Sequence, residues 1–247
     1  MGSLYMILLV KKRNNMNWYK TANLWEEIKR HGPKSTSFLS KNISYDEGEY
    51  ETLVQYLQNK LNYSQEQAKQ YLDTMPESQR RDYFIHNYGW SVPTQESITK
   101  LKGFIGNDTV LSIGSGYGLW TRLLKDIGVN AIATTRLSDQ DNSHMPKENH
   151  FFTEVENLDN IDSLNKYPEA GVLMMSWPPY NDPMAYDTLF HFKGNKVIYI
   201  GEGSGGCTGC DRFHNLLYNE WREIEDMYID IPQWQGIHDQ VALYTRK

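Results

Sequence analysis

The sequence has little cysteine and no long hydrophobic run. Cys207 and Cys210 are the only cysteines among 247 residues, too few for a disulfide framework, so a reducing, cytoplasmic compartment is the expectation. The apolar stretch 4–10 is far shorter than the roughly 18 residues that span a membrane, and basic residues follow it rather than precede it. We therefore expect neither a membrane partner nor a secretory signal.

Basic charge is scarce in the larger part of the chain. Residues 1–100 carry 13 Lys and Arg against 11 Asp and Glu, whereas residues 101–247 carry 12 against 20. Non-specific binding of nucleic acid needs a basic surface, so the acidic part argues against it, although a local basic groove is still compatible. Apolar residues are abundant at 39% and aromatic residues at 13%, which predicts a packed core rather than disorder.

Helical patterns fill the first 94 residues. Apolar spacing predicts helices over 17–30, 50–62 and 77–87, and Ser64 is a suitable N-cap for a further helix that ends before Pro76. We assign residues 1–94 to an N-terminal helical region and residues 95–247 to a second domain. Because Met16 offers a second start, residues 1–15 are expected to be an upstream extension.

From residue 95 onward, short apolar runs alternate with helix-length segments. This alternation is typical of a parallel sheet with helices on both faces. The last two predicted strands are joined by a short turn and are expected to be antiparallel. The predicted fold is α/β: a Rossmann-like, seven-stranded, mostly parallel sheet with an antiparallel terminal hairpin. The strands are predicted over 109–113, 131–134, 150–153, 171–175, 196–200, 225–231 and 240–245, with a helix over 120–127.

A glycine-rich loop follows the first predicted strand and opens a helix. Residues 114–118 read G-S-G-Y-G, and glycines at such a turn allow close approach of a ligand. The N–H groups at the start of a helix favour a carboxylate or phosphate. A dinucleotide site requires G-x-G-x-x-G, whereas Leu119 occupies the sixth position, so the spacing argues against a nicotinamide cofactor. A tight turn without a ligand is the alternative.

The G-x-G-x-G spacing and the predicted sheet resemble motif I and the strand arrangement of S-adenosylmethionine (SAM)-dependent methyltransferases. The resemblance implies that SAM is the cofactor and that an acidic residue ends the second strand, where this sequence has Thr135. This departure is compatible with weaker SAM binding, with a substitute acid such as Asp139, or with a domain that has lost the cofactor. It also implies that Glu154 or Glu156 meets the adenine amino group; either is otherwise a solvated loop charge. The loop residues implied to contact SAM are Gly114, Ser115, Gly116 and Gly118.

A proline-rich box follows the fourth predicted strand. Residues 176–180 read S-W-P-P-Y, which resembles motif IV of amino-group methyltransferases, [Asp/Asn]-Pro-Pro-[Tyr/Phe]. In that motif a polar side chain and a backbone carbonyl hold the acceptor NH₂, the prolines expose the carbonyl, and the aromatic ring stacks on the acceptor. Here Trp177 replaces the acidic residue and can only donate. A rigid surface turn is the alternative. The resemblance implies acceptor-side roles for Trp177, Pro178, Pro179 and Tyr180, and a cofactor-side place for Ser176.

An aromatic segment precedes the first predicted strand. Residues 88–94 read Y-G-W-S-V-P-T, which resembles the part that closes over SAM in methyltransferases with motif X ahead of motif I. The resemblance implies cofactor contacts for Tyr88, Pro93 and Thr94. A plain aromatic hinge between domains is the alternative.

Two later loops are expected at the same edge, because ligands of open parallel sheets bind at the carboxyl ends of the strands. Glu202 follows the fifth strand and is a candidate base, as is His238 in the final turn, where a surface histidine is the alternative. Cys207, Cys210 and His214 have the spacing C-x₂-C-x₃-H, but a closed zinc site needs a fourth ligand. We predict a simple loop there, with metal or redox chemistry as alternatives.

The W-P-P-Y box, the G-G-C-T-G loop and the turn P-Q-W-x-G-I-H-D are together similar to a set of uncharacterised methyltransferase-like proteins, over roughly residues 88–247. The leading hypothesis is a SAM-dependent methyltransferase acting on an unidentified acceptor, with an amino group suggested by the box. One alternative is a non-catalytic binding or scaffold protein on a degenerate methyltransferase fold. The other is a nucleic-acid amino-methyltransferase.

Overall fold

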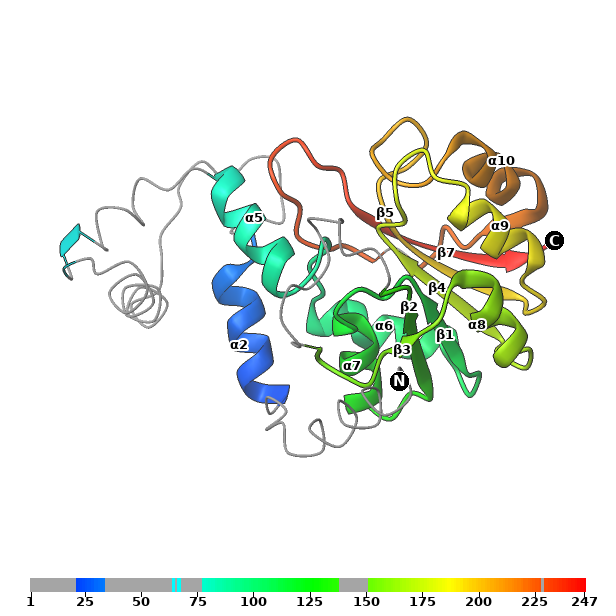
Figure 1. Cartoon of the computed structure of the whole chain (residues 1–247), viewed down its shortest axis with the longest axis horizontal. Coiled ribbons are helices and arrows are strands. Elements are labelled where there is room, and N and C mark those ends of the chain that lie inside the picture. The colour runs from blue at the N-terminus through cyan, green and yellow to red at the C-terminus, as the bar shows by residue number, and fades with distance from the viewer. Residues whose placement is uncertain (1–20, 34–63, 65, 68–76, 138–150, 228) are drawn as a thin grey trace, which may run out of the picture.

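A computed structural model describes residues 21–33, 64, 66, 67, 77–137, 151–227 and 229–247 (Figure 1). Helices and strands alternate through most of this part, as the sequence predicted. The helices are α2 (Thr21–His31), α5 (Glu77–Asn87), α6 (Gln95–Ile105), α7 (Leu119–Asp126), α8 (Asn160–Lys166), α9 (Met184–His191) and α10 (Asp211–Glu220). The strands are β1 (Val110–Ile113), β2 (Ala131–Thr135), β3 (Glu156–Asn157), β4 (Val172–Ser176), β5 (Lys196–Gly201), β6 (Trp221–Glu223) and β7 (Gln240–Arg246).

Among the described residues, seven strands form one sheet in the order β3-β2-β1-β4-β5-β7-β6. The pairs from β3 to β5 are parallel, and β7 is antiparallel to both β5 and β6. The order reverses between β1 and β4, which is the point where open α/β sheets bind ligands. The predicted Rossmann-like α/β fold with an antiparallel terminal pair is confirmed.

The sheet separates two apolar cores. Along β4, Val172 and Met174 face a cluster with α2, α5, α6 and α7, whereas Leu173 and Met175 face a cluster with α8, α9 and α10. Burial on both faces is typical of central parallel strands. The two helical layers are visible on opposite sides of the sheet in Figure 1. The edge at which β1, β4 and β5 end is therefore framed by helices on both sides.

The third strand lies later in the chain than predicted. The predicted strand over 150–153 is wrong in its described part: residues 151–153 form no strand, and β3 instead pairs with Thr134 and Thr135. Phe152 is buried, but its N–H donates to the carbonyl oxygen of Tyr117 in the glycine loop at 2.9 Å. The apolar run is thus buried at residues 151–153, but the backbone N–H of Phe152 bonds to a loop and not to a strand.

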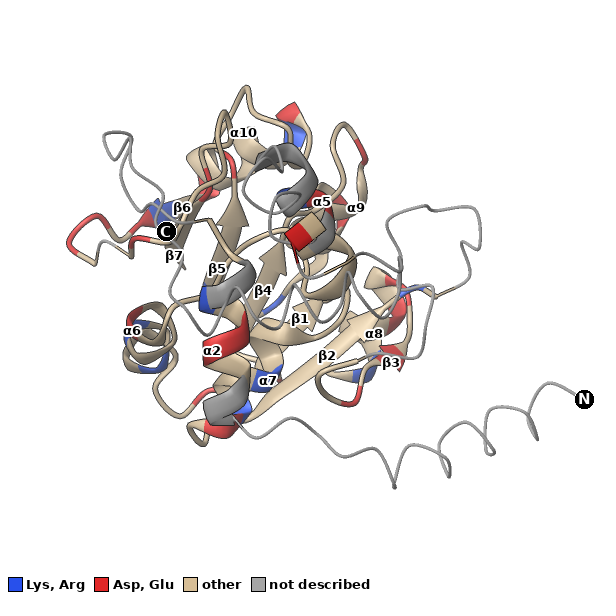
Figure 2. Ribbon diagram, turned by 90° about the vertical axis from the view of Figure 1, so that its left-hand side faces the viewer, with Lys and Arg blue, Asp and Glu red and all other residues tan. Residues whose placement is uncertain are grey.

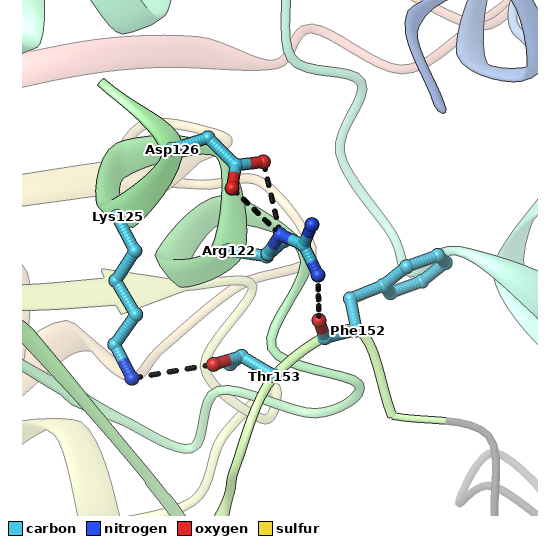
Figure 3. A network of polar contacts seen from close by, with 5 residues as sticks. All are labelled: Arg122, Lys125, Asp126, Phe152 and Thr153. Carbon is cyan, nitrogen blue, oxygen red and sulfur yellow. Dashed lines mark hydrogen bonds and ion pairs between the residues drawn. The ribbon is translucent and has the colours of Figure 1, made fainter. Parts of the chain in front are cut away.

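Side chains of α7 hold the same segment in place (Figure 3). Arg122 donates from Nη1 to the carbonyl oxygen of Phe152 at 3.2 Å, and its Nε lies 2.9 Å from both carboxylate oxygens of Asp126. Lys125 donates to the hydroxyl of Thr153 at 3.2 Å. These contacts fix the segment beside the start of α7, next to the glycine loop.

The terminal strand pair is also shifted. The strand predicted over 225–231 is wrong: β6 begins at Trp221 and ends at Glu223, and Ile229 makes only an isolated bridge to Val241. Ile229 and Ile231 are buried because the long connection 224–239 packs into the core shared with α2 and α5. The prediction of β7 is confirmed, whereas the short turn between the two strands is not.

The N-terminal helices join the main core where they are described. Helices α2 and α5 confirm the predictions over 17–30 and 77–87, and Ser64 makes the reciprocal bonds of a capping box with Gln67. Leu24 of α2 and Phe84 of α5 belong to the same cluster as Trp234. A domain boundary at residue 94 stays a prediction. The helix over 50–62, the extension 1–15 and Asp139 lie outside the described residues.

Charged residues lie mainly on helices and loops, while the central strands carry almost none (Figure 2). Acidic and basic positions are interspersed rather than gathered in one basic stripe. In the described part of the chain, no helix combines the length and apolarity needed to cross a bilayer.

Candidate functional site

The glycine loop joins β1 to α7 with a left-handed backbone. Gly114, Gly116 and Gly118 have φ values of 67°, 54° and 75°, at which an L side chain is strained. A Cβ on Gly118 would lie 2.9 Å from Cγ2 of Thr153 and 3.0 Å from Cγ2 of Val155, so internal packing requires this glycine. Among the residues that the structure describes, a Cβ on Gly116 would meet no atom within 4 Å. The loop therefore leaves open space at Gly116, where a ligand can approach the backbone.

Ser115 and Tyr117 fix the loop from two sides. The N–H of Ser115 donates to the carbonyl oxygen of Thr134 at 3.0 Å, while its Oγ is buried without a hydrogen-bond partner among the described residues. Buried hydroxyls are normally satisfied, so this one marks a place for a polar ligand atom. The hydroxyl of Tyr117 donates to the carbonyl oxygen of His86, and burial raises the pKa of Tyr117 to about 12.

The end of β2 carries Thr135, as predicted, and this residue is buried. Glu156 pairs instead with Lys166 and Tyr167, one partner on each carboxylate oxygen. Burial opposes ionisation of Glu156, but these hydrogen bonds outweigh it and lower its pKa. Glu156 thus has structural partners, and the adenine contact predicted for it stays a prediction. Glu154 is exposed.

Trp177, the first residue after β4, has a left-handed φ of 50°, which costs a bulky residue roughly 1–2 kcal/mol. Its N–H donates to the carbonyl oxygen of Ile200 at 2.8 Å. Its indole stacks on Trp90 with ring centroids 4.9 Å apart, and the guanidinium carbon of Arg81 lies 5.4 Å from both rings. Its Nε1 donates to Oδ1 of Asp239 at 2.7 Å. Backbone strain of this kind persists where surrounding contacts determine it, often at functional sites.

The two prolines of the box direct their carbonyls to the chain's own amides. The carbonyl oxygen of Pro178 accepts from the N–H of Gly209 at 3.0 Å, and that of Pro179 accepts from the N–H of Asp182 at 3.4 Å. Each carbonyl thus already has one partner within the chain, and the predicted contact of these prolines with the acceptor stays a prediction. The side chain of Tyr180 is 69% exposed, so its predicted contact with an acceptor stays a prediction.

Tyr88 and Thr94 have structural partners. The hydroxyl of Tyr88, the residue after α5, donates to Oε2 of Glu27 in α2 at 2.9 Å. Thr94 is the N-cap of α6: its Oγ1 accepts from the N–H of Ser97 at 3.0 Å, and its own N–H donates to Oγ of Ser97 at 2.9 Å. Pro93 is buried just before it. Tyr88 and Thr94 thus have structural roles, and their predicted cofactor contacts stay predictions.

Ser91, which the sequence analysis did not single out, connects the segment 88–94 to the site. Its buried Oγ accepts from Nε1 of Trp120 in α7 at 2.9 Å and lies 2.8 Å from Oγ of Ser176 at the end of β4. One hydroxyl therefore links the segment, the glycine-loop helix and the proline-rich box. In the sequence, the aromatic residue Trp90 beside it was the feature that could have drawn attention to this position.

Glu202 joins two loops instead of acting as a free base. Its Oε2 accepts from the N–H of Cys207 at 2.7 Å, and its Oε1 accepts from the N–H of His238 at 2.9 Å. Burial alone would raise the pKa of Glu202, but the two donors outweigh it and lower the pKa. These bonds give Glu202 a structural role, and its predicted role as a base stays a prediction.

Asp239 is the functional candidate that sequence reasoning missed. It is 1% exposed and directly precedes β7, whose Gln240 pairs with Gly201 at the end of β5. Its Oδ1 accepts from Trp177, whereas its Oδ2 has no hydrogen-bond partner among the described residues. Burial raises the pKa of Asp239 to about 7; the Trp177 hydrogen bond opposes this rise.

The remaining candidates lie on the loop and turn around Glu202. The side chain of His238 is exposed, so its role as a base stays a prediction. Nε2 of His214 lies 2.9 Å from the carbonyl oxygen of Thr208, and both Cys207 and Cys210 are free thiols. Within the described ranges, no three His, Cys, Asp or Glu side chains gather in a group that could hold a metal.

No family model and no curated protein matches this chain. Among solved structures, an O-methyltransferase from Bacillus cereus in complex with SAH is 14% identical, with 80% of this chain and 100% of that chain covered and a TM-score of 0.42. A ribosomal protein L11 methylase from Lactobacillus delbrueckii subsp. bulgaricus is 13% identical, with 64% and 82% covered and a TM-score of 0.39. A protein in the NADB-Rossmann superfamily from Streptococcus agalactiae is 11% identical, with 63% and 70% covered and a TM-score of 0.40. At such scores the similarity carries no argument, and the fold assignment rests on the sheet itself.

Proposed function

We propose that this chain is a SAM-dependent methyltransferase that binds SAM at the glycine loop and methylates an acceptor held near Trp177. The observation that carries the proposal is the loop 114–118, which leaves β1 in a left-handed path, with open space at Gly116, and enters α7. It lies in a sheet whose order and antiparallel β7 resemble the strand arrangement of SAM-dependent methyltransferases.

The residues at this edge fit a ligand that carries an amino acid and a ribose. The unpartnered Oγ of Ser115 is available to a polar ligand atom, and the first N–H groups of α7 favour a carboxylate. Thr135 at the end of β2 would offer an uncharged oxygen to a ribose hydroxyl. When bound, SAM supplies an electrophilic methyl group on a positively charged sulfur.

The chain's own contribution is mainly alignment, because methyl transfer is an in-line displacement that depends on the placement of its two reactants. The rings of Trp90 and Trp177 stack on each other at the end of β4. The hydroxyl of Ser91 connects the end of β4 to α7 through Ser176 and Trp120. An amino group is the acceptor we favour. The position of the Pro-Pro-Tyr box directly after β4 supports this choice.

Isothermal titration calorimetry with SAM and S-adenosylhomocysteine (SAH) tests the cofactor. We expect the wild type to bind both, and Gly116→Ala to bind at least about 10-fold more weakly, a loss of about 1.4 kcal/mol, because the new methyl group enters the ligand space. Gly128→Ala is the matched control, because Gly128 also has a left-handed φ, of 84°, and no described atom lies within 4 Å of the added Cβ. Gly128 follows the C-terminal end of α7, away from the glycine loop. If the wild type binds neither compound at millimolar concentration, the proposal is wrong.

A non-catalytic binding protein on the same fold is the second candidate. The donor-only indole of Trp177 in the acidic position of the box and the uncharged Thr135 favour it. Methyl incorporation from labelled SAM, measured separately on small molecules, proteins and nucleic acids from a cell extract, distinguishes the candidates. Incorporation into any fraction supports the enzyme and indicates the acceptor class; SAH binding without incorporation supports the binding protein.

A further inference from the structure

The acidic residue absent from the start of the proline-rich box is supplied by another part of the chain. Asp239 lies 62 residues after Trp177, yet its Oδ1 accepts the indole N–H of Trp177 at 2.7 Å. Gln240 pairs with Gly201, and β5 pairs with β4 up to Ser176, so the carboxylate lies at the strand ends that position the box. Tertiary structure thus places a carboxylate beside the residue that replaces one.

Within the described part of the chain, only one oxygen of this carboxylate has a partner. Oδ2 of Asp239 is buried and makes no hydrogen bond among the described residues. An unsatisfied buried carboxylate oxygen is costly, and such an atom calls for an explanation in a ligand or a proton. The backbone of Asp239 is held by a hydrogen bond, because Nε2 of Gln233 donates to the carbonyl oxygen of Asp239 at 2.8 Å. The free oxygen is therefore held in a defined place.

The neighbouring carboxylate, Glu202, differs from Asp239 in its hydrogen bonds. Both oxygens of Glu202 accept from backbone N–H groups, whereas Oδ2 of Asp239 has no partner among the described residues. The ionisable groups that act on Asp239 electrostatically are Glu202 and Arg81, and Asp239 in turn acts on the buried Tyr199. Nε of Arg81 is itself buried without a hydrogen-bond partner, on the guanidinium that lies over the Trp177 ring.

We propose that Asp239, oriented by Trp177, accepts a hydrogen bond on Oδ2 from the N–H or O–H of the methyl acceptor and takes its proton. The inference rests on the proposed methyltransferase function. The acceptor heteroatom forms a bond to the methyl carbon, the bond between that carbon and the sulfonium sulfur breaks with its electron pair left on sulfur, and the acceptor proton passes to Oδ2. Trp177 is a positioning residue that donates to the other oxygen.

Burial of the carboxylate suits it to proton transfer. Burial raises the pKa of Asp239 to about 7, so the group can both accept and release a proton near neutrality. The Trp177 hydrogen bond opposes this rise. Removal of the indole N–H should therefore raise the pKa of Asp239 further, an effect that a purely structural role of Trp177 would not produce.

The test needs no acceptor. Sinefungin is an analogue of SAM in which a carbon bearing an ammonium group replaces the methylsulfonium, so its charge lies where the methyl group leaves. A carboxylate facing that point should favour sinefungin over SAH. We expect Asp239→Asn to weaken sinefungin by about 10-fold or more and to leave SAH unchanged, because the lost contact is charge-assisted. Asp182→Asn, which removes the same charge from the exposed turn after the box, is the matched control.

The pH dependence gives a second readout. Sinefungin binding to the wild type should strengthen from pH 6 to pH 8 as Asp239 ionises, and Trp177→Phe should move the midpoint of this change to higher pH. If the wild type binds neither compound, the proposed function fails and this inference fails with it. If SAH and sinefungin both bind and Asp239→Asn does not alter their ratio, the inference alone is overturned. Unchanged SAH affinity of the variant shows that it is folded.

Discussion

The cofactor side and the acceptor side of this site are built in different ways. At the cofactor side, five consecutive residues between β1 and α7 supply the left-handed turn, the open space at Gly116 and the free hydroxyl of Ser115. At the acceptor side, Arg81, Trp90, Trp177 and Asp239 come from four separate parts of the chain.

The difference teaches which kind of site a sequence displays. A loop that works through its backbone appears as a local pattern of glycines, whereas a site made of side-chain contacts between distant segments has no local pattern. The acceptor side also carries the strained Trp177 and an oxygen of Asp239 that has no partner among the described residues, so we expect effects there that depend on pH and are more strongly coupled.

The largest effect is expected from pH at the acceptor side. Burial raises the pKa of Asp239 from 3.8 to about 7, so between these values the folded chain keeps a proton that the unfolded chain has released. The stability contributed by this proton is fully present below about pH 4 and is lost as pH rises through about 7. Relative to Asp239→Asn, the free energy of unfolding of the wild type should fall over this window by up to about 4 kcal/mol. Urea denaturation of both proteins at a series of pH values measures this difference. If the free energy of unfolding of the two proteins changed in parallel with pH, the prediction would be contradicted.

The next effect concerns the one part of the cofactor side that depends on packing. Gly118→Ala combines a left-handed φ with a Cβ placed 2.9 Å from Thr153, so we expect a loss of about 3 kcal/mol in the free energy of unfolding. Gly116→Ala has the same backbone strain without the steric contact and should lose about 1 to 2 kcal/mol. Chemical denaturation measures the difference between the two variants in the free energy of unfolding. Equal losses would show that the packing around Gly118 adjusts to the added methyl group.

A double-mutant cycle across Trp177 and Asp239 tests the coupling. At pH 8, Trp177→Phe leaves a buried carboxylate oxygen without its donor, so we expect a cost of about 1–3 kcal/mol that shrinks when Asp239→Asn is also present. Trp177→Phe and Gly116→Ala, which lie on opposite sides of the site, should instead be additive within about 0.5 kcal/mol. Additive effects of Trp177→Phe and Asp239→Asn would remove the contrast between the two sides.

The smallest effect concerns Thr94, which the structure shows as an N-cap and which the sequence assigned to the cofactor. Thr94→Ala removes the N-cap of α6 and should lower the free energy of unfolding by about 1 kcal/mol. The affinity for SAH, measured by calorimetry, should not change, because both polar groups of Thr94 already bond to Ser97. If Thr94→Ala instead bound SAH more weakly than the wild type and were as stable, the predicted cofactor contact of Thr94 would be supported.

Much of the fold could be predicted because short apolar runs and glycine turns report β1, β2, β4, β5 and β7 directly. The two errors share one cause. Residues 151–153 and 225–231 are apolar because they are buried, but the Phe152 N–H bonds to the glycine loop and Ile229 only bridges to Val241. Hydrophobicity reports burial, and it does not say which backbone groups pair.

The candidate site divides in the same manner. The glycine loop and the position of Thr135 follow from the sequence, since each depends on the end of a strand that the sequence reveals. Glu156 and Glu202 were assigned to a ligand because a carboxylate at such a position suits one, yet both bond to the chain itself. Asp239 was overlooked because its significance depends on Trp177, 62 residues away.

By itself, the sequence determined the α/β fold, the strand that leads into the glycine loop and the loop's spacing, because these depend on residues close together in the chain. Only the tertiary structure decided which carboxylate has a free oxygen, which hydroxyls cap helices, and what the indole of Trp177 touches. The physical reason is that hydrogen-bond partners and burial are properties of pairs of residues, and here the decisive pairs join β4 to β7, α5 to the proline-rich box, and α7 to the segment before α6.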